Sequence, residues 1–260
     1  MPPGVAINMG TILRTDGLCK AFGGIVVADN INVSIDAGQI LGLIGPNGAG
    51  KTSLFNLISG VIKPDAGRIY LNDAQIDHQA LYRRARTGIA RTWQNMLLFR
   101  SMSVMDNMLI APRDYPGESV FRLFLQPGQV KAAEAAARER ALKILARMDL
   151  SAAAEAMVTD LPFGHQKLIG LARTLMNDGD LLLLDEPMAG VEGAAYETMQ
   201  RVVREEAASG RAVCVVEHNV SFIKDLCTTA VFMAQGKILE SGSVEKLLAS
   251  KVLTELYFGV

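Results

Sequence analysis

Residues Gly45 to Thr52 read GPNGAGKT, a complete G-x-x-x-x-G-K-[ST] pattern. The pattern follows the apolar run Gln39 to Ile44 and precedes a stretch expected to be helical from about Lys51. In such a strand, loop and helix, glycines allow successive backbone N–H groups to point at phosphate oxygens, and the helix amino end adds partial positive charge. The sequence therefore predicts a phosphate-binding loop, with Lys51 reaching the outer phosphates and the Thr52 hydroxyl on a magnesium ion.

A second polar pair follows another apolar run, because Leu181 to Pro187 reads LLLLDEP. This pattern is typical of a buried parallel strand that places two carboxylates at its carboxyl end, where α/β folds bind ligands. Asp185 is predicted to hold magnesium and Glu186 to polarise water as a general base. The alternative is an acidic strand end that caps the next helix, and the upstream phosphate loop disfavours it.

Three further residues are ambiguous when each is taken alone. Phe22 precedes a Gly-Gly pair and is either a core aromatic beside a turn or a ring on which adenine stacks. Gln94 follows a predicted strand and is either a solvated amide or a contact to metal or attacking water. His165 lies in DLPFGHQ, residues 160–166, which is either an ordinary helix start or a second helix amino end aimed at a phosphate.

The stretch after Gln94 is unusually rich in methionine and leucine and reads MLLFRSMSVMDNMLIA, residues 96–111. Val104, Met108 and Ala111 follow helical spacing and favour a helix core. Methionine also suits an adaptable apolar surface for a partner. Both interpretations stay open on the residues alone.

The remaining pattern gives the elements that position these residues. Ile12 to Ile44 alternates short apolar runs with turns and predicts several strands. Residues 131–148 and 167–176 predict helices, 212–217 predict a buried strand that ends before His218, and 229–242 predict a hairpin.

Length and composition limit the possible classes. The 260 residues, half of them hydrophobic, suit one large α/β domain or a core with a smaller lobe. A net charge of −1 with scattered Lys and Arg gives no electrostatic footprint for nucleic acid. Three cysteines show no metal spacing and suit a reducing compartment. The start lacks a signal-peptide pattern, and apolar runs are far shorter than the roughly 20 residues that span a bilayer, so any membrane role is expected to be peripheral.

With the phosphate loop, LLLLDEP and a histidine one strand later in this order, the chain resembles the ATPase subunit of an ABC transporter over nearly all its length. The resemblance implies ATP and Mg²⁺ as cofactors. It implies that Phe22 stacks on adenine, that Gln94 senses magnesium and couples to the membrane subunit, and that His218 contacts the terminal phosphate. Asp185 and Glu186 match the Walker B pair, and the Walker A loop is matched by Gly45, Pro46, Asn47, Gly48, Ala49, Gly50, Lys51, Thr52 and Ser53.

The resemblance also implies an α/β fold: a P-loop NTPase core with a mostly parallel sheet, an antiparallel β-rich subdomain and an inserted helical subdomain. The core and β subdomain are expected in residues 1–94 and 177–260, and the helical subdomain in 95–176. Two copies, as a homodimer or a heterodimer, would sandwich two ATP molecules. The Met-rich stretch is then expected to receive a coupling helix of the permease at the cytoplasmic face of the membrane.

Residues 161–166, LPFGHQ, occupy the place of the family's signature, usually LSGGQ; we call them the signature segment. Pro162 replaces a serine and removes a hydroxyl donor, and an aromatic replaces a glycine. That aromatic resembles the subgroup for uptake of branched-chain amino acids and amides, as do RTWQNMLLF and ELYFG. Glu192 replaces the usual D-loop aspartate. By resemblance, the nucleotide of the other protomer is contacted by Phe163, Gly164, His165 and Gln166.

The leading functional expectation is an ATPase that drives import of branched-chain or other amino acids. Its expected partners are transmembrane permease subunits and, indirectly, a periplasmic or extracellular solute-binding protein. A close alternative changes the cargo to urea, short amides or lipid, since EHNV and DEPMAGVE also resemble lipid-exporting ATPases. A soluble ATPase of the same superfamily acting on DNA or the ribosome is disfavoured, because the chain has one cassette, no sustained heptads and no basic face.

Overall fold

A six-stranded sheet forms the centre of the computed structural model, which describes residues 10–93, 97–113, 124–218 and 220–250. Its strand order is β10-β9-β3-β8-β7-β6, and all neighbours are parallel except β10, which pairs antiparallel with β9. Every residue of β3, β7 and β8 is buried, which explains their unbroken apolar runs. The strands are β3 (Ile40–Ile44), β6 (Ile89–Arg91), β7 (Leu181–Asp185), β8 (Ala212–Val216), β9 (Thr229–Ala234) and β10 (Lys237–Ser243).

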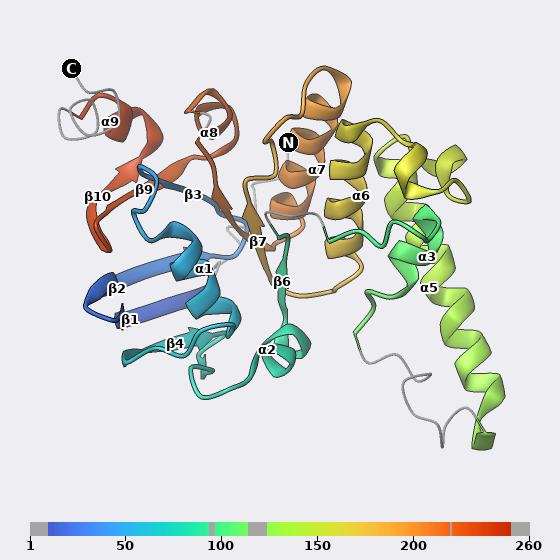
Figure 1. Ribbon diagram of the computed structural model, residues 1–260, viewed down its shortest axis with the longest axis horizontal. Helices are drawn as coiled ribbons and strands as arrows, with labels where there is room; N and C mark the ends of the chain where they lie inside the picture. The colour runs from blue at the N-terminus through green and yellow to red at the C-terminus, as the bar shows by residue number, and fades with distance from the viewer. Residues whose placement is uncertain (1–9, 94–96, 114–123, 219, 251–260) are drawn as a thin grey trace, which may run out of the picture.

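A second, antiparallel sheet has the order β2-β1-β4-β5 and covers one face of the first. Helix α1 (Lys51–Ser59) lies between the two sheets (Figure 1), and its buried Leu54, Phe55, Leu57 and Ile58 belong to the core shared by both. The predicted β-rich opening is thereby confirmed. The strands are β1 (Thr11–Phe22), β2 (Ile25–Asp36), β4 (Ala66–Leu71) and β5 (Ala74–Gln75).

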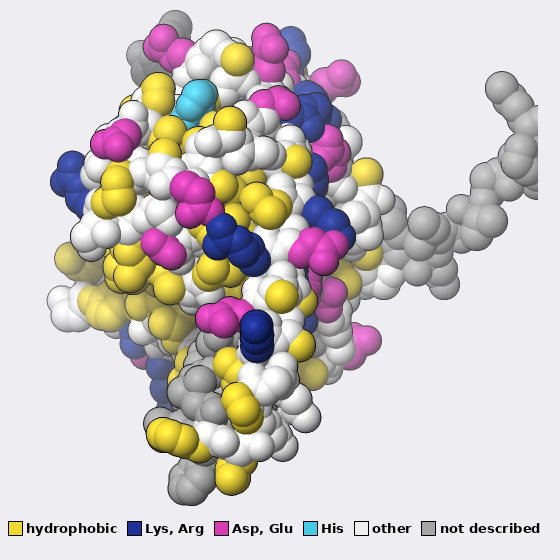
Figure 2. Space-filling model, turned by 90° about the vertical axis from the view of Figure 1, so that its right-hand side faces the viewer, with side chains coloured by type: hydrophobic (Ala, Val, Ile, Leu, Met, Phe, Trp, Pro, Cys, Tyr) yellow, Lys and Arg dark blue, Asp and Glu magenta, His cyan; other side chains and the backbone are white. Residues whose placement is uncertain are grey.

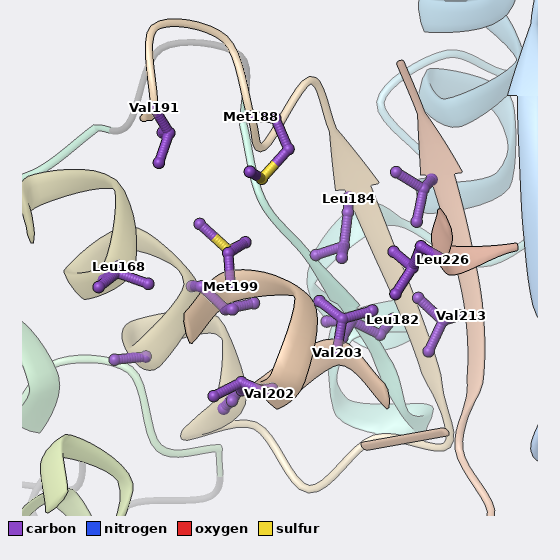
Figure 3. Close-up of a cluster of buried hydrophobic side chains, with 14 of the residues drawn as sticks. Leu168, Leu182, Leu184, Met188, Val191, Met199, Val202, Val203, Val213 and Leu226 are labelled. Carbon is purple, nitrogen blue, oxygen red and sulfur yellow. The ribbon is translucent and has the colours of Figure 1, made fainter. Parts of the chain in front are cut away.

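The opposite face of the parallel sheet is covered by helices. Because side chains alternate along a strand, Leu181 and Leu183 face α1, whereas Leu182 and Leu184 face the helices. Figure 3 shows Leu182 and Leu184 with Met199, Val202 and Val203 of α7 in this second core. Besides α1, the described helices outside the segment between β6 and β7 are α2 (Leu81–Thr87), α7 (Ala194–Ala208), α8 (Val220–Leu226) and α9 (Val244–Leu248).

Between β6 and β7 the described chain is helical and lies away from the antiparallel sheet (Figure 1). This confirms the inserted helices, while the subdomain boundaries remain a prediction. The helix expected from residue 167 begins at Phe163, because Pro162 takes the N-cap position, so the signature segment continues directly into the helix. The elements are α3 (Val104–Leu109), α5 (Pro127–Arg147), the 3₁₀ turns η2 (Ser151–Ala153) and η3 (Val158–Asp160), and α6 (Phe163–Leu175).

The structure confirms the helix-core interpretation of the Met-rich stretch, and the partner surface stays a prediction. Val104, Met105 and Met108 are buried in the helical core, whereas Phe99 and Ile110 are exposed. The face formed by the helical region carries acidic and basic side chains interspersed with apolar ones (Figure 2). Within the described ranges, none of the helices combines the length and the apolar character needed to cross a membrane.

Candidate functional site

The predicted phosphate loop connects the end of β3 to the start of α1, as the sequence pattern requires. Its glycines are needed for close backbone approach: a Cβ on Gly45 would collide with the carbonyl oxygen of Met233, and one on Gly50 with that of Val27. Gly50 also has φ +101° at the N-cap of α1. The loop is held further by the bond from the Gly236 N–H to the Ala49 carbonyl (3.0 Å). Its shape is therefore fixed by the surrounding strands.

Lys51 is buried inside the loop. Its Nζ donates to the carbonyl oxygens of Gly45 (2.6 Å) and Pro46 (2.9 Å). Burial lowers the pKa of Lys51, and the carboxylates of Glu186 and Asp185 oppose that shift. The lysine thus places a cation within the loop and close to two carboxylates.

A hollow of about 390 Å³ opens over the loop, and we call it the loop hollow. It brings together residues from the β1–β2 hairpin, the loop and the ends of β7 and β8. Phe22, which the sequence predicts to stack on adenine, does not line the loop hollow and is 45% exposed. Its partner across the hairpin, Ile25, does line the hollow. The hollow is lined by Ile25, Val27, Asn47, Gly48, Ala49, Gly50, Lys51, Thr52, Ser53, Glu186 and His218.

Glu186 and His218 form a pair on the wall of the loop hollow, with His218 Nε2 2.9 Å from Glu186 Oε1. Glu186 has φ +48°, a left-handed conformation that costs a non-glycine residue about 1–3 kcal/mol. Its N–H still donates to the carbonyl of Val216 on β8 (2.9 Å). Such strain next to a hollow is typical of functional sites. The structure therefore brings together the two residues that the sequence placed on separate strands.

Asp185 lies behind this pair, outside the wall of the loop hollow, and its side chain is only 1% exposed. Oδ2 accepts from Nη2 of Arg91 (3.0 Å), whereas the buried Oδ1 has no hydrogen-bond partner among the described residues. Burial raises the pKa of Asp185, and the hydrogen bond from Arg91 opposes the shift. An unpartnered carboxylate oxygen and the hydroxyl of Thr52 are hard oxygen donors, so these residues fit a magnesium ion.

Gln94, the third predicted metal contact, lies outside the described residues. Thr92 and Trp93, the two residues before it, are described. Thr92 is hydrogen-bonded to β7, the strand that carries Asp185. The Thr92 N–H donates to the Leu183 carbonyl (2.9 Å), and the Asp185 N–H donates to Thr92 Oγ1 (2.9 Å). The segment leading to Gln94 is therefore attached to β7.

The signature segment is not part of the loop hollow of its own chain. Phe163 is 49% exposed, and its ring packs on Gly190, where an added Cβ would lie 2.9 Å from Phe163 Cε1. Gly164 packs against Ala195, and the Gln166 amide donates to the Leu161 carbonyl (2.8 Å). His165 is half-buried. Within one chain, the signature segment therefore does not share a hollow with the phosphate loop, the other predicted half of the site.

Sequence reasoning missed three buried charged residues around the site. Arg91 contacts Asp185, Lys167 Nζ approaches the Glu186 carbonyl at 3.4 Å, and Glu217 Oε1 accepts from the Met188 N–H at 2.7 Å. The available signal was a charge within or beside an apolar run, as in GIAR and AVCVVE. Such charges are seldom fully buried unless they are paired.

Comparisons with known proteins identify relatives of this chain. A model of the family described as "ABC transporter" matches residues 28–189. The chain is 30% identical over 249 residues to the high-affinity branched-chain amino acid transport ATP-binding protein LivG of Escherichia coli (strain K12), covering 95% of this chain and 98% of LivG. It is also 30% identical over 251 residues to the lipopolysaccharide export system ATP-binding protein LptB of Acidithiobacillus ferridurans, covering 96% and 98%. A crystal structure of the ADP conformation of an ATP-binding cassette of an ABC transporter superposes with a TM-score of 0.82 at 30% identity, covering 96% of this chain and 100% of that one.

Proposed function

The chain belongs to the ABC transporter ATP-binding family and is an ATPase, and we propose that it drives the import of branched-chain or other amino acids through a membrane permease. The observation that carries the hydrolytic part is the Glu186–His218 pair at 2.9 Å on the wall of the loop hollow, which Lys51 also lines. A general base needs to lie within hydrogen-bond reach of the water it activates, and a carboxylate on this wall satisfies that condition.

In the proposed reaction, the backbone N–H groups of the loop bind the phosphates of ATP, and Lys51 exchanges its bonds to Gly45 and Pro46 for the outer phosphates. Thr52, Asp185 and Gln94 would hold Mg²⁺, and the bound ion would neutralise phosphate charge. Glu186 accepts a proton from the attacking water. His218 orients that carboxylate and faces the terminal phosphate, and Phe22 stacks on the adenine.

We extend the proposal to two ATPase subunits, as a homodimer or a heterodimer. The support is that Phe163 is half exposed and does not line the loop hollow of its own chain. Each hollow would be completed by the other subunit's Phe163, Gly164, His165 and Gln166. Because Pro162 offers no hydroxyl, backbone N–H groups at the start of α6 become the main donors to the nucleotide.

The proposed permease contact is an apolar surface next to the segment that contains Gln94. Exposed Leu97, Phe99 and Ile110 line a cavity of about 500 Å³ there together with Met102, Ala111 and Arg173. A coupling helix of the permease would insert its apolar side chains into this cavity. The ATPase would then sit at the cytoplasmic face of the membrane, with a periplasmic or extracellular solute-binding protein acting indirectly.

Amino acids are the preferred cargo because of the likeness to LivG and the aromatic in the signature segment. The likeness to LptB supports lipid export as the second candidate. The test is ATP hydrolysis by the purified membrane complex. Stimulation by a binding protein loaded with leucine, isoleucine or valine, and not by urea, short amides or lipopolysaccharide, is expected. Stimulation by lipopolysaccharide alone would overturn the import proposal and leave the ATPase assignment intact.

A further inference from the structure

Arg91, the last residue of β6, is one of the most buried charged side chains next to the site, with 5% exposure. Its guanidinium joins two elements. Nη1 donates to Asn56 Oδ1 (2.8 Å) and Ser59 Oγ (2.9 Å) of α1, and Nη2 donates to Asp185 Oδ2 (3.0 Å) of β7. A single planar group therefore ties the helix that follows the phosphate loop to the buried carboxylate.

Aromatic rings fix the plane of this guanidinium. The Cζ of Arg91 lies 4.5 Å from the ring centroid of Trp93 and 5.5 Å from that of Phe55. Such stacking over aromatic faces favours arginine over lysine, because a guanidinium is flat and an ammonium is not. The rings and the two α1 acceptors together determine where Nη2 points.

The two carboxylate oxygens of Asp185 have different surroundings as a result. Oδ2 is occupied by Arg91, and Oδ1 is buried without a hydrogen-bond partner in the described part of the chain. The backbone of Asp185 is held as well, through the bond from its N–H to Thr92 Oγ1. The end of β6 thus fixes both the main chain and the side-chain rotation of this residue.

We propose that Arg91 is a positioning residue for the metal-binding carboxylate: it holds Asp185 Oδ2 against α1, so that Oδ1 stays oriented for the divalent cation. This inference rests on the proposed role of Asp185. Partners that orient a ligating carboxylate typically change metal affinity by about 10–100-fold when they are removed.

Arg84 of α2 provides a matched control because it is buried to a similar extent and contacts the same helix. Nη1 donates to the carbonyls of Leu57 (2.6 Å) and Ile58 (2.9 Å) at the end of α1. Its other bonds go to the carbonyls of Asp77 and Gln79. Removing Arg84 therefore takes a buried arginine away from α1 without touching Asp185.

The test measures the dissociation constant of Mn²⁺, as a probe for Mg²⁺, by electron paramagnetic resonance on the full chain with a non-hydrolysable ATP analogue. Arg91→Met is expected to raise this constant about tenfold or more, with nucleotide affinity in EDTA unchanged within about twofold. Arg84→Met is expected to lower the melting temperature and leave the Mn²⁺ constant within about twofold of the wild type.

Two milder variants keep the test decisive if Arg91→Met does not fold. Arg91→Lys retains the charge and loses the bridge, and Asn56→Ala removes one α1 acceptor; both are expected to weaken Mn²⁺ binding by less than Arg91→Met. Wild-type Mn²⁺ affinity in the Arg91 variants would overturn the proposal, as would equal weakening in Arg84→Met. If the wild-type chain bound no nucleotide in EDTA, the proposed function itself would fail, and the role of Arg91 would not be the cause.

Discussion

The phosphate loop and the signature segment both lead into the first turn of a helix, yet the chain builds them in opposite ways. At the loop, α1 begins at a buried lysine, its N-cap Gly50 is held in a left-handed conformation, and neighbouring backbones leave no room for a Cβ. At the signature segment, α6 begins after Pro162, which is exposed, and Phe163 is half exposed. The loop is thus shaped within one chain, whereas the signature segment lies outside that chain's loop hollow with Phe163 half exposed, as expected for a half-site that acts on a second subunit.

The largest expected effect is at the loop side. Glu186→Gln keeps the shape of the side chain and removes the general base, so turnover is expected to fall about 10²–10⁴-fold while ATP affinity is kept. Steady-state hydrolysis and calorimetric ATP binding measure the two quantities. Wild-type turnover in this variant would remove Glu186 as the base.

The next largest effect is on stability, at the carboxyl end of α1, where Arg84 bonds the carbonyls of Leu57 and Ile58. Arg84→Met removes four hydrogen bonds from the guanidinium to main-chain carbonyls, those of Leu57 and Ile58 buried and those of Asp77 and Gln79 partly buried, so the free energy of unfolding is expected to fall by about 3 kcal/mol or more. Denaturant unfolding is the measurement, with Arg83→Met on the exposed face of α2 as the control. Equal stability of both variants would show that α1 does not depend on this arginine.

Lys51→Ala removes the cation inside the loop. Hydrogen bonds to charged groups contribute about 1.5–3 kcal/mol each, so ATP binding is expected to weaken about 10–150-fold in calorimetry. The control is Lys131→Ala on the exposed side of α5, which should bind ATP normally. Unchanged affinity in Lys51→Ala would count against the phosphate-loop assignment.

The smallest effect is at the signature segment, where Pro162→Ser restores a hydroxyl at the N-cap of α6. A serine cap is worth about 1 kcal/mol, so the melting temperature is expected to rise by a few degrees. Because residue 162 is exposed and does not line the loop hollow of its own chain, hydrolysis by the isolated chain should change less than hydrolysis by the assembled complex. A larger gain in the isolated chain would indicate that the segment acts on its own nucleotide.

The same contrast explains what could be predicted from sequence. The loop, β7, β8 and the β9–β10 hairpin follow from local patterns, since buried parallel strands and glycine turns have distinctive compositions. The start of α6 at Phe163, before the predicted residue 167, does not follow from the pattern, because proline and glycine usually interrupt a helix, whereas Pro162 takes the N-cap here. Arg91, Lys167 and Glu217 could not be placed, because their partners lie on other strands and helices and no periodicity encodes such pairs.

The most direct test of the central claim, that the signature segment acts on the nucleotide of a second subunit, is sedimentation of Glu186→Gln with and without ATP. A monomer is expected without ATP and a dimer with it. Adding Gly164→Glu, which places a bulky anion where Gly164 packs on Ala195, should abolish the dimer and keep ATP binding. An ATP-bound Glu186→Gln chain that remains monomeric at every protein concentration would contradict the account.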